Sequence, residues 1–383
     1  MEKLLKQLKD INATIRVENG DLKLKFPKNN YNSSIIDEIK YNKKELIEFI
    51  NKRQEISDSN LLINKALEKE YYRLSSVQKR LYFLCQLNPS SLVFNLSQIV
   101  EIEGDIDKVK VENTFKKLID RHESLRTSIQ IINGEAFQKI SDNVEFSIEY
   151  SESTEANSES VITKFIRPFD LGEAPLLRVG LVKLKNKSHL LLVDVHHIIA
   201  DGISMSILIK HFMDIYNHKK LPQVKLHYKD YAEWQETLKE QKQFQKQRDF
   251  WLREFVDNMS IIDLPVDFSR PSVRNYSTGL KSFVIDIEKT KCLRLIEEEE
   301  EATMFMVLFS ILIILLSKLS NQDDVTVGTG IANRNHVGLD SIIGMFVNVI
   351  ALRNHPKGSY SFKEFLTTVR TKTLSAFENQ SYP

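Results

Sequence analysis

The chain has 383 residues, of which 42% are hydrophobic and 27% charged, values typical of folded proteins with room for two or three domains. Its 53 Lys and Arg against 52 Asp and Glu give a net charge of +1, which excludes a general attraction to nucleic acid. Cys85 and Cys292 are too far apart for a cysteine metal motif or a disulfide framework, and they indicate a reducing compartment.

The first 53 residues predict a small module in the order αββαα. Residues 4–11 carry Leu and Ile at helical spacing, and residues 33–53 form one or two amphipathic helices with Ser33 or Ser34 as a cap. Between them, residues 14–26 alternate apolar and polar side chains around Asn19-Gly20, which predicts a β-hairpin. A core of about 50 residues is marginal, so such a module gains most by pairing with itself or with a partner.

The predicted hairpin is basic. Residues 1–53 hold 12 Lys and Arg against 8 Asp and Glu, and Arg16, Lys23 and Lys25 share the polar face of the hairpin. This face would attract an acidic peptide, or it is simply a solvated surface. On charge alone both interpretations stay open.

Residues 54–70 read as a linker that becomes partly helical, and from residue 71 strands and helices alternate. Strands are expected at 96–104, 189–197 and 323–330, and helices at 110–122 and 205–219. Residues 151–160 read as a mobile polar loop. The fold class is therefore α/β or α+β.

Residues 302–317 form the longest apolar run, "ATMFMVLFSILIILLS". At this length it is too short for a membrane span and is interrupted by Thr and Ser, so we expect a buried helix. The first residues lack the apolar core of a signal peptide. We therefore expect a cytoplasmic protein without a membrane partner.

The stretch "VDVHHIIADGISM" (193–205) carries the strongest chemical signal. His197 follows a predicted buried strand, Asp201-Gly202 forms a turn, and a helix follows, which is where α/β proteins place chemistry. A histidine there can exchange a proton with an amine or alcohol, and the glycine lets a backbone N–H approach an oxyanion. Asp201 would need a cationic partner, most simply an arginine.

Two other interpretations of the motif compete. His197 and Asp201 are four residues apart, as metal ligands can be, but no further His, Cys or Asp cluster with suitable spacing supplies the remaining ligands. His196 and His197 could also be two satisfied core histidines. Spacing alone does not separate these possibilities.

"HHIIADG" resembles the His-His-x-x-x-Asp-Gly motif of the condensation domains of nonribosomal peptide synthetases. Further stretches resemble the family's other signatures and follow its order over residues 71–383. They are "LSSVQKRLYFLCQLNPSSLVFNL" (74–96), "RHESLRTSI" (121–129), "RPFDLGEAPLLRV" (167–179), "YKDYAEWQ" (228–235), "VTVGTGIANRN" (325–335) and "IGMFVNVIALR" (343–353). Residues 1–53 resemble the β-hairpin docking domain at the start of some synthetase subunits.

The resemblance implies a chloramphenicol acetyltransferase-like fold with two lobes in a V, about 71–240 and 241–383, and a tunnel between them. Two carrier domains would present a donor acyl thioester and an acceptor aminoacyl thioester on 4'-phosphopantetheine arms, and the acceptor amine would attack the donor carbonyl. No cofactor would be bound by this chain itself. The docking module would receive the acidic C-terminal tail of an upstream subunit, or pair as a homodimer.

Carried over by position, His197 is the histidine at the reaction centre, as base or as positioning group. His196 and Asp201 would shape the loop, and Gly202 would allow close backbone approach. Arg334 is the favoured ionic partner of Asp201, with Arg126 as the alternative, and Asn348 matches a tunnel position. His196 argues against a heterocyclisation domain, which has aspartate there. Epimerisation domains share the motif, but their other signatures differ and they follow a carrier domain. The first signature is similar to that of domains that join an L-donor to an L-acceptor.

The family pattern continues beyond "FENQSYP", so the resemblance implies a second lobe that is incomplete in this chain. Two alternatives to a condensing enzyme follow. One is a docking protein whose catalytic tunnel is incomplete; the other is an acyltransferase for soluble thioesters, against which the docking module argues.

Overall fold

The computed structural model describes residues 14–18, 21–25, 39, 42–43, 45–47, 63–154, 158–184, 188–239, 241–257, 261–269, 271, 278–336 and 338–382. Residue contacts divide the chain into two compact units, Met1–Asn64 and Lys65–Pro383. The predicted linker, 54–70, spans this boundary. Its described part, residues 63–70, contains no helix, so the expected partial helix is wrong there.

The described part of the first unit contains the predicted hairpin. Strand β1 (Thr14–Glu18) pairs antiparallel with β2 (Asp21–Lys25), and Glu18 lies opposite Asp21, so two residues connect the strands. This agrees with the Asn-Gly turn signal, although residues 19 and 20 lie outside the described residues. Helical residues occur within 39–47, where Leu46 is fully buried. The helix expected at 4–11 and the caps Ser33 and Ser34 lie outside the described residues.

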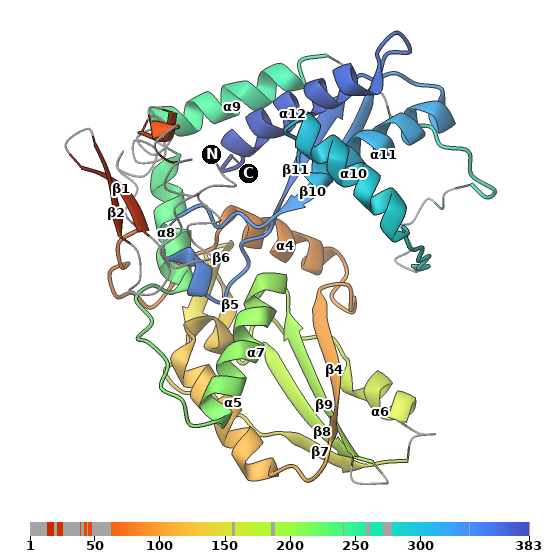
Figure 1. The fold of residues 1–383 in the computed structure, drawn as a ribbon. Coiled ribbons are helices and arrows are strands. Elements are labelled where there is room, and N and C mark those ends of the chain that lie inside the picture. Colours follow the sequence, from red (N-terminus) through yellow and green to blue (C-terminus); the bar gives the residue numbers. More distant parts are fainter. Residues whose placement is uncertain are drawn as a thin grey trace. The chain divides into compact units, whose positions relative to one another are not determined.

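The second unit contains a four-stranded sheet (Figure 1). Its strands lie in the order β4 (Asn95–Glu103), β9 (Ser188–His196), β8 (Leu177–Lys183) and β7 (Glu149–Glu152). The first two pairs are antiparallel and β7 pairs parallel with β8. Strand β9 is buried along nearly its whole length, as its continuous apolar sequence predicts.

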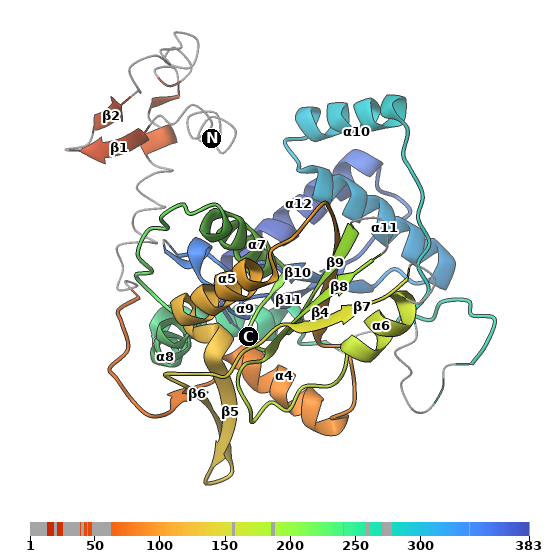
Figure 2. The same ribbon diagram turned by 90° about the horizontal axis from the view of Figure 1, so that it is seen from below.

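Helices cover this sheet. Helices α5 (Lys108–Arg121) and α7 (Gly202–Tyr216) run side by side along it, where Phe115 packs on Phe212 with ring centroids 4.9 Å apart (Figures 1 and 2). Helix α6 (Ser158–Phe165) packs Phe165 against Val182, Leu190 and Leu192. Residues 151–160 were expected to form a loop, but they include the end of β7 and the start of α6. The apolar positions of α6 find a partner only in the folded sheet.

A second group of elements lies beside this sheet. It comprises α4 (Ser76–Leu87), η1 (Glu123–Arg126), α8 (Tyr228–Leu238) and a three-stranded sheet in the order β3 (Tyr72–Arg73), β6 (Glu135–Ile140), β5 (Thr127–Ile132). Ser75 and Gln78 form a capping box at the start of α4. We call the described residues from 65 to 239 the N-lobe.

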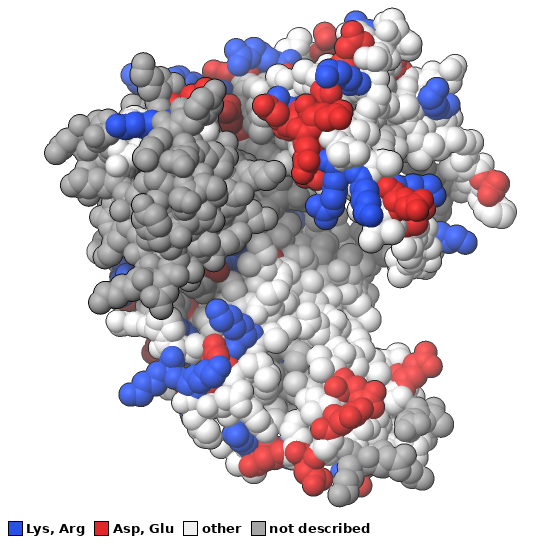
Figure 3. Space-filling model, in the orientation of Figure 1, with Lys and Arg blue, Asp and Glu red and all other residues white. Residues whose placement is uncertain are grey.

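The described residues from 241 onward form the C-lobe. Its two strands, β10 (Val325–Ile331) and β11 (Asn348–Asn354), pair antiparallel. Its helices are α9 (Lys242–Glu254), α10 (Ile287–Glu299), α11 (Met304–Ser320) and α12 (Phe362–Glu378), and η4 (Leu339–Ser341) lies in the loop between the strands. Buried side chains of α11, α12 and both strands form one core. Figure 3 shows the surface hollowed between the two lobes, and the N-lobe surface beside this hollow carries few charged side chains.

The apolar run 302–317 folds as α11, but the expectation of a buried helix is only half right. Phe309 and Ile313 belong to the C-lobe core, whereas Leu308, Ile311, Leu312, Leu315 and Leu319 are each 40–51% exposed. Within the described residues no single helix is long and apolar enough to cross a membrane. The helix pair α10 and α11 passes the same criteria of length and composition together, with a bend of 106° between them.

Candidate active site

His197 follows β9 directly and lies four residues before the N-cap of α7. Its side chain is half-buried, and its Nδ1 lies 2.8 Å from the backbone oxygen of Ala200. Because a carbonyl oxygen only accepts hydrogen bonds, Nδ1 carries the proton, and in the neutral ring Nε2 carries the lone pair. No described residue forms a hydrogen bond with Nε2. This ring nitrogen is therefore available to a substrate as a hydrogen-bond acceptor.

His196 has the opposite arrangement. It is 5% exposed, and its Nδ1 accepts a hydrogen bond from the backbone N–H of Ile198 at 3.1 Å. Its Nε2 therefore carries the proton and lies 3.8 Å from Cys85 Sγ. Burial, with smaller effects from His197 and Arg178, lowers the pKa of His196 to about 4. His196 is thus neutral near pH 7, and its two ring nitrogens contact the Ile198 backbone and the Cys85 side chain.

Asp201 is the N-cap of α7 and is completely buried. Its Oδ1 accepts hydrogen bonds from the backbone N–H and the hydroxyl of Ser204, both at 2.7 Å, and its Oδ2 accepts one from Phe346 N at 3.1 Å. Arg334 Nη2 lies 3.0 and 3.3 Å from the two carboxylate oxygens. With both oxygens engaged in this way, Asp201 fixes the loop and is not arranged to share a metal with His197.

Arg334 connects Asp201 to the C-lobe. Its Nη1 donates to the backbone oxygens of Leu339 and Ile342 at 2.6 and 2.7 Å, and its guanidinium carbon lies 4.1 Å from the ring centroid of Phe346. Arg126, the other arginine considered as a partner of Asp201, bonds elsewhere. Its Nη1 donates to Ser141 O at 2.7 Å, and its Nη2 lies 3.9 Å from Glu123.

The C-lobe segment 343–348, "IGMFVN", is held by N-lobe side chains along its length. Ser124 Oγ donates to Ile343 O, Tyr228 OH donates to Met345 O, and the Ser204 hydroxyl accepts a hydrogen bond from Gly344 N at 3.0 Å. At Gly344 an added Cβ would lie 2.0 Å from Tyr228 Cδ2, so the ring fits only against a glycine. Sequence reasoning missed these contacts, since only the fold brings Ser124, Ser204 and Tyr228 together with residues 343–348.

Asn348 is 3% exposed and begins β11. Its Oδ1 accepts hydrogen bonds from Arg80 Nη2 at 2.6 Å and from Val349 N at 2.9 Å. Because Arg80 belongs to α4, this bond joins the two lobes. Gly202 is exposed, and an added Cβ there would have no atom within 4 Å, so the space beside its backbone is open.

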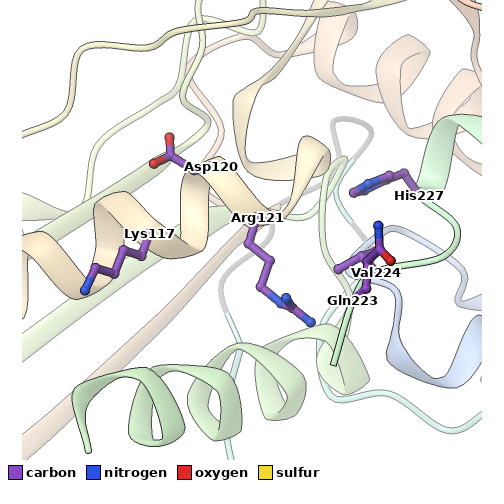
Figure 4. Close-up of a pocket in the computed structure, with 6 residues that line it drawn as sticks. All are labelled: Lys117, Asp120, Arg121, Gln223, Val224 and His227. Atoms are coloured by element: carbon purple, nitrogen blue, oxygen red, sulfur yellow. The ribbon is translucent and has the colours of Figure 1, made fainter. Parts of the chain in front are cut away.

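A separate pocket of about 440 Å³ lies between the end of α5 and the loop before α8. Figure 4 shows Arg121, Gln223, Val224 and His227 gathered around it, while Lys117 and Asp120 lie along α5. Arg121 Nη2 also donates to Pro222 O. None of the residues of the histidine motif lines this pocket. In the described ranges, no three His, Cys, Asp or Glu side chains are grouped as metal ligands.

The basic residues of the hairpin occupy related positions. Arg16 and Lys23 are register partners, and Lys25 is two residues further along β2. In an antiparallel ladder these three positions belong to one face.

A model of the condensation domain family matches residues 67–383, which includes the whole histidine motif. The chain belongs to the condensation domain family. Bacitracin synthase 3 of Bacillus licheniformis is 43% identical over 320 residues, which cover 84% of this chain and 5% of that protein. Bacitracin synthase 2 of the same organism is 38% identical over 378 residues, or 99% of this chain and 14% of that protein. The chain thus spans a small part of these relatives.

Solved structures show the same condensation domain fold. The X-domain in a complex with OxyB from teicoplanin biosynthesis has a TM-score of 0.78 at 23% identity, over 84% of this chain and 74% of that one. The first condensation domain of the CDA synthetase has a TM-score of 0.68 at 18% identity, over 82% and 76%. A cyclization-docking bidomain of Sorangium cellulosum has a TM-score of 0.72 at 18% identity, over 99% and 78%. The predicted chloramphenicol acetyltransferase-like fold of mixed helices and strands is confirmed.

Proposed function

We propose that this condensation domain forms an amide bond between a donor acyl thioester and the α-amine of an acceptor aminoacyl thioester. Both substrates would arrive on the phosphopantetheine arms of carrier domains. The observation that carries the proposal is the hydrogen bond from His197 Nδ1 to Ala200 O, which leaves Nε2 of the neutral ring free to accept a proton. Family membership supplies the reaction class.

The proposed step is an acyl transfer from sulfur to nitrogen. The acceptor amine attacks the donor carbonyl, a C–N bond forms, and the C–S bond breaks. His197 Nε2 accepts a hydrogen bond from the amine, takes its proton as the bond forms, and returns it to the departing thiolate. Holding the two tethered substrates together supplies much of the remaining acceleration.

The surrounding contacts support a positioning role for the rest of the motif. His196 and Asp201 are buried and fully occupied by loop and helix contacts, so they keep His197 in one orientation. Gly202 leaves open space beside the start of α7, where a thioester oxygen could approach the backbone. Asn348 and Arg80 would form part of the wall between the lobes.

The test is a condensation assay with two separate carrier domains, one loaded with an aminoacyl donor and one with an acceptor. Mass spectrometry follows the dipeptide on the acceptor arm with wild type, His197→Ala and the control His355→Ala, whose side chain is 43% exposed and lies beside Asp324 in the C-lobe. We expect product with wild type and the control, and a loss of about 100-fold or more with His197→Ala. Equal rates for wild type and His197→Ala would overturn the assignment. Product from free thioesters at the same rate would favour a generic acyltransferase.

We also propose that the N-terminal hairpin binds an acidic C-terminal peptide of an upstream subunit. Two observations support this. Bacitracin synthase 2 and the cyclization-docking bidomain both align over 99% of the chain, the hairpin included. Arg16 and Lys23 lie directly opposite each other in the ladder, and like charges in that register repel unless an anion neutralises them.

Docking is tested by measuring the binding of a fluorescent acidic peptide to wild type and to a double variant, Arg16→Glu with Lys23→Glu. The control carries Lys289→Glu and Lys291→Glu, two exposed positions of α10. We expect at least about tenfold weaker binding for the hairpin variant only. Equally weakened peptide binding in both variants would mean that the net charge of the chain, and not the hairpin, determines the affinity. Peptide binding without any condensation would leave docking as the function of this chain.

A further inference from the structure

A second buried carboxylate lies in the strand that leads into the histidine motif. Asp194 is two residues before His196, on the same face of β9, and is completely buried. Its Oδ1 accepts a hydrogen bond from Ser97 Oγ at 2.8 Å, and its Oδ2 accepts hydrogen bonds from Asn95 Nδ2 at 2.9 Å and Arg178 Nη1 at 3.1 Å. Asp194 therefore joins three adjacent strands, β4, β9 and β8, next to the motif.

Arg178 extends this arrangement to the segment before β8. Its Nη1 and Nη2 donate to the backbone oxygens of Arg167 and Pro168, both at 2.6 Å. Its guanidinium carbon lies 3.6 Å from the ring centroid of Phe169, so the cation stacks on the ring. Arg178 thus fixes both the backbone at 167–168 and the orientation of the Phe169 ring.

Phe169 carries the contact to the motif. Its ring meets the imidazole of His196 edge-on, with centroids 5.9 Å apart and an interplanar angle of 80°. The His196 ring in turn accepts a hydrogen bond from the backbone N–H of Ile198, in the loop that carries His197. A continuous line of contacts therefore runs from the sheet interior to the loop between β9 and α7.

We propose that Asp194, Arg178 and Phe169 are positioning residues that hold the His196 ring in the orientation that anchors the His197 loop. We call these three residues the Asp194 network. Phe169 fills the space into which the His196 ring would otherwise rotate, and rotation would release the Ile198 N–H. None of the three acts on substrate; each acts through the next. Their effect on catalysis rests on the proposed condensation activity, but the effect on His196 does not.

The first experiment therefore needs no activity. The full chain is labelled with ¹⁵N-histidine, and NMR reports the tautomer and pKa of His196 in wild type, Phe169→Leu, Phe169→Tyr and the C-lobe control Phe305→Leu. In wild type we expect the Nε2–H tautomer, because Nδ1 accepts the Ile198 N–H, and a pKa of about 4, because the ring is buried and lies beside His197 and Arg178. Phe169→Leu should admit water and raise this pKa by about one unit or more. Phe169→Tyr, which keeps the aromatic edge, should match wild type, as should Phe305→Leu.

The second experiment measures condensation with the same variants. Phe169→Leu should lower kcat about tenfold with KM within about twofold of wild type, because the reacting group is displaced while substrate contacts remain. Phe169→Tyr should keep the wild-type kcat, because it keeps the aromatic ring. Arg178→Lys cannot reach both carbonyl groups and stack on the ring, so it should reproduce the effect. Combining Arg178→Lys with Phe169→Leu should add little, since both act through the same contact.

The outcomes separate the two proposals. An unchanged His196 tautomer and pKa in Phe169→Leu would overturn the positioning role, whatever the activity. A wild-type chain without condensation but with the expected NMR changes would overturn the proposed function and leave the positioning role standing. An equal loss of kcat in Phe169→Leu and Phe169→Tyr would also count against the Asp194 network.

Discussion

Arg334 Nη2 lies 3.0 Å from Asp201 Oδ1, although the two residues are 133 positions apart and belong to different lobes. The side chains are 4% and 0% exposed, so this ion pair is removed from water. Asp201 caps the helix that follows the histidine loop, and Arg334 donates hydrogen bonds to the backbone oxygens of residues 339 and 342 in the C-lobe. The pair therefore links the loop that carries His197 to the position of the C-lobe.

Removing one member of this pair should destabilise the fold strongly. Arg334→Met leaves the Asp201 carboxylate buried without its cation, and we expect the free energy of unfolding to fall by about 3–5 kcal/mol. Urea denaturation followed by circular dichroism measures the change. A double variant, Arg334→Met with Asp201→Asn, should lose less than the sum of the single losses. Additive losses would mean that the two groups do not interact.

Gly344 should not tolerate a side chain. The Cβ of Gly344→Ala would lie 2.0 Å from Tyr228 Cδ2, and Tyr228 is itself fixed by hydrogen bonds to Ser75 and Met345. We expect a loss of at least about 1–3 kcal/mol from overpacking. The matched control is Gly358→Ala, where an added Cβ meets open space. Equal melting temperatures for the two variants would show that Tyr228 moves freely.

The hydrogen bond between Arg80 and Asn348 should hold β11 against α4. Arg80→Met removes a charged donor at 2.6 Å, worth about 1.5–3 kcal/mol. Hydrogen exchange measured by mass spectrometry should show faster exchange in peptides covering residues 343–354, with little change in α6. The exposed-surface variant Lys79→Met, one residue away, serves as control. Uniformly faster exchange across the chain would instead indicate global destabilisation.

Stability should fall in mild acid because two buried histidines resist protonation. Burial lowers the pKa of His122 to about 3 and that of His196 to about 4 from an ordinary value of 6.5. Between 6.5 and these values the unfolded chain binds protons that the folded chain does not. Above pH 6.5 the free energy of unfolding is therefore not reduced by these histidines. Below pH 6.5 it falls by about 1.4 kcal/mol per pH unit for each histidine, until the pH reaches that histidine's pKa in the folded chain.

Urea midpoints at pH 7 and pH 5 measure this dependence. His122 Nε2 lies 3.0 Å from His211 Nδ1, and Arg121 and His227 are also nearby, so protonation of His122 would place a buried positive charge beside Arg121 and two further imidazole rings. In His122→Gln we expect lower stability at pH 7 but a shallower loss between pH 7 and 5. The same slope in wild type and variant would assign the acid sensitivity to other groups.

Several elements could be predicted because their signals are local. The Asn-Gly turn with alternating residues predicted β1 and β2, and the apolar run at 189–197 predicted a central strand. Helix α11 shows the limit of such reasoning. Its composition predicted burial, yet the covered side chains are those that meet α10, α12, β10 and β11, and the opposite face is exposed. Composition gives the apolar character of a segment but not the number of surfaces that pack against it.

The sequence by itself determined the position of the histidine loop between a strand and a helix, and it named His197, Asp201 and Arg334. It could not determine which ring nitrogen of His197 is free, because that depends on the place of Ala200 O in the folded loop. Nor could it reveal Ser204, Tyr228, Phe346 or the Asp194 network, whose members meet across strands and lobes. Strand and helix signals arise from neighbours in the chain, whereas a tautomer and a buried ion pair arise from groups that only tertiary packing brings within hydrogen-bond distance.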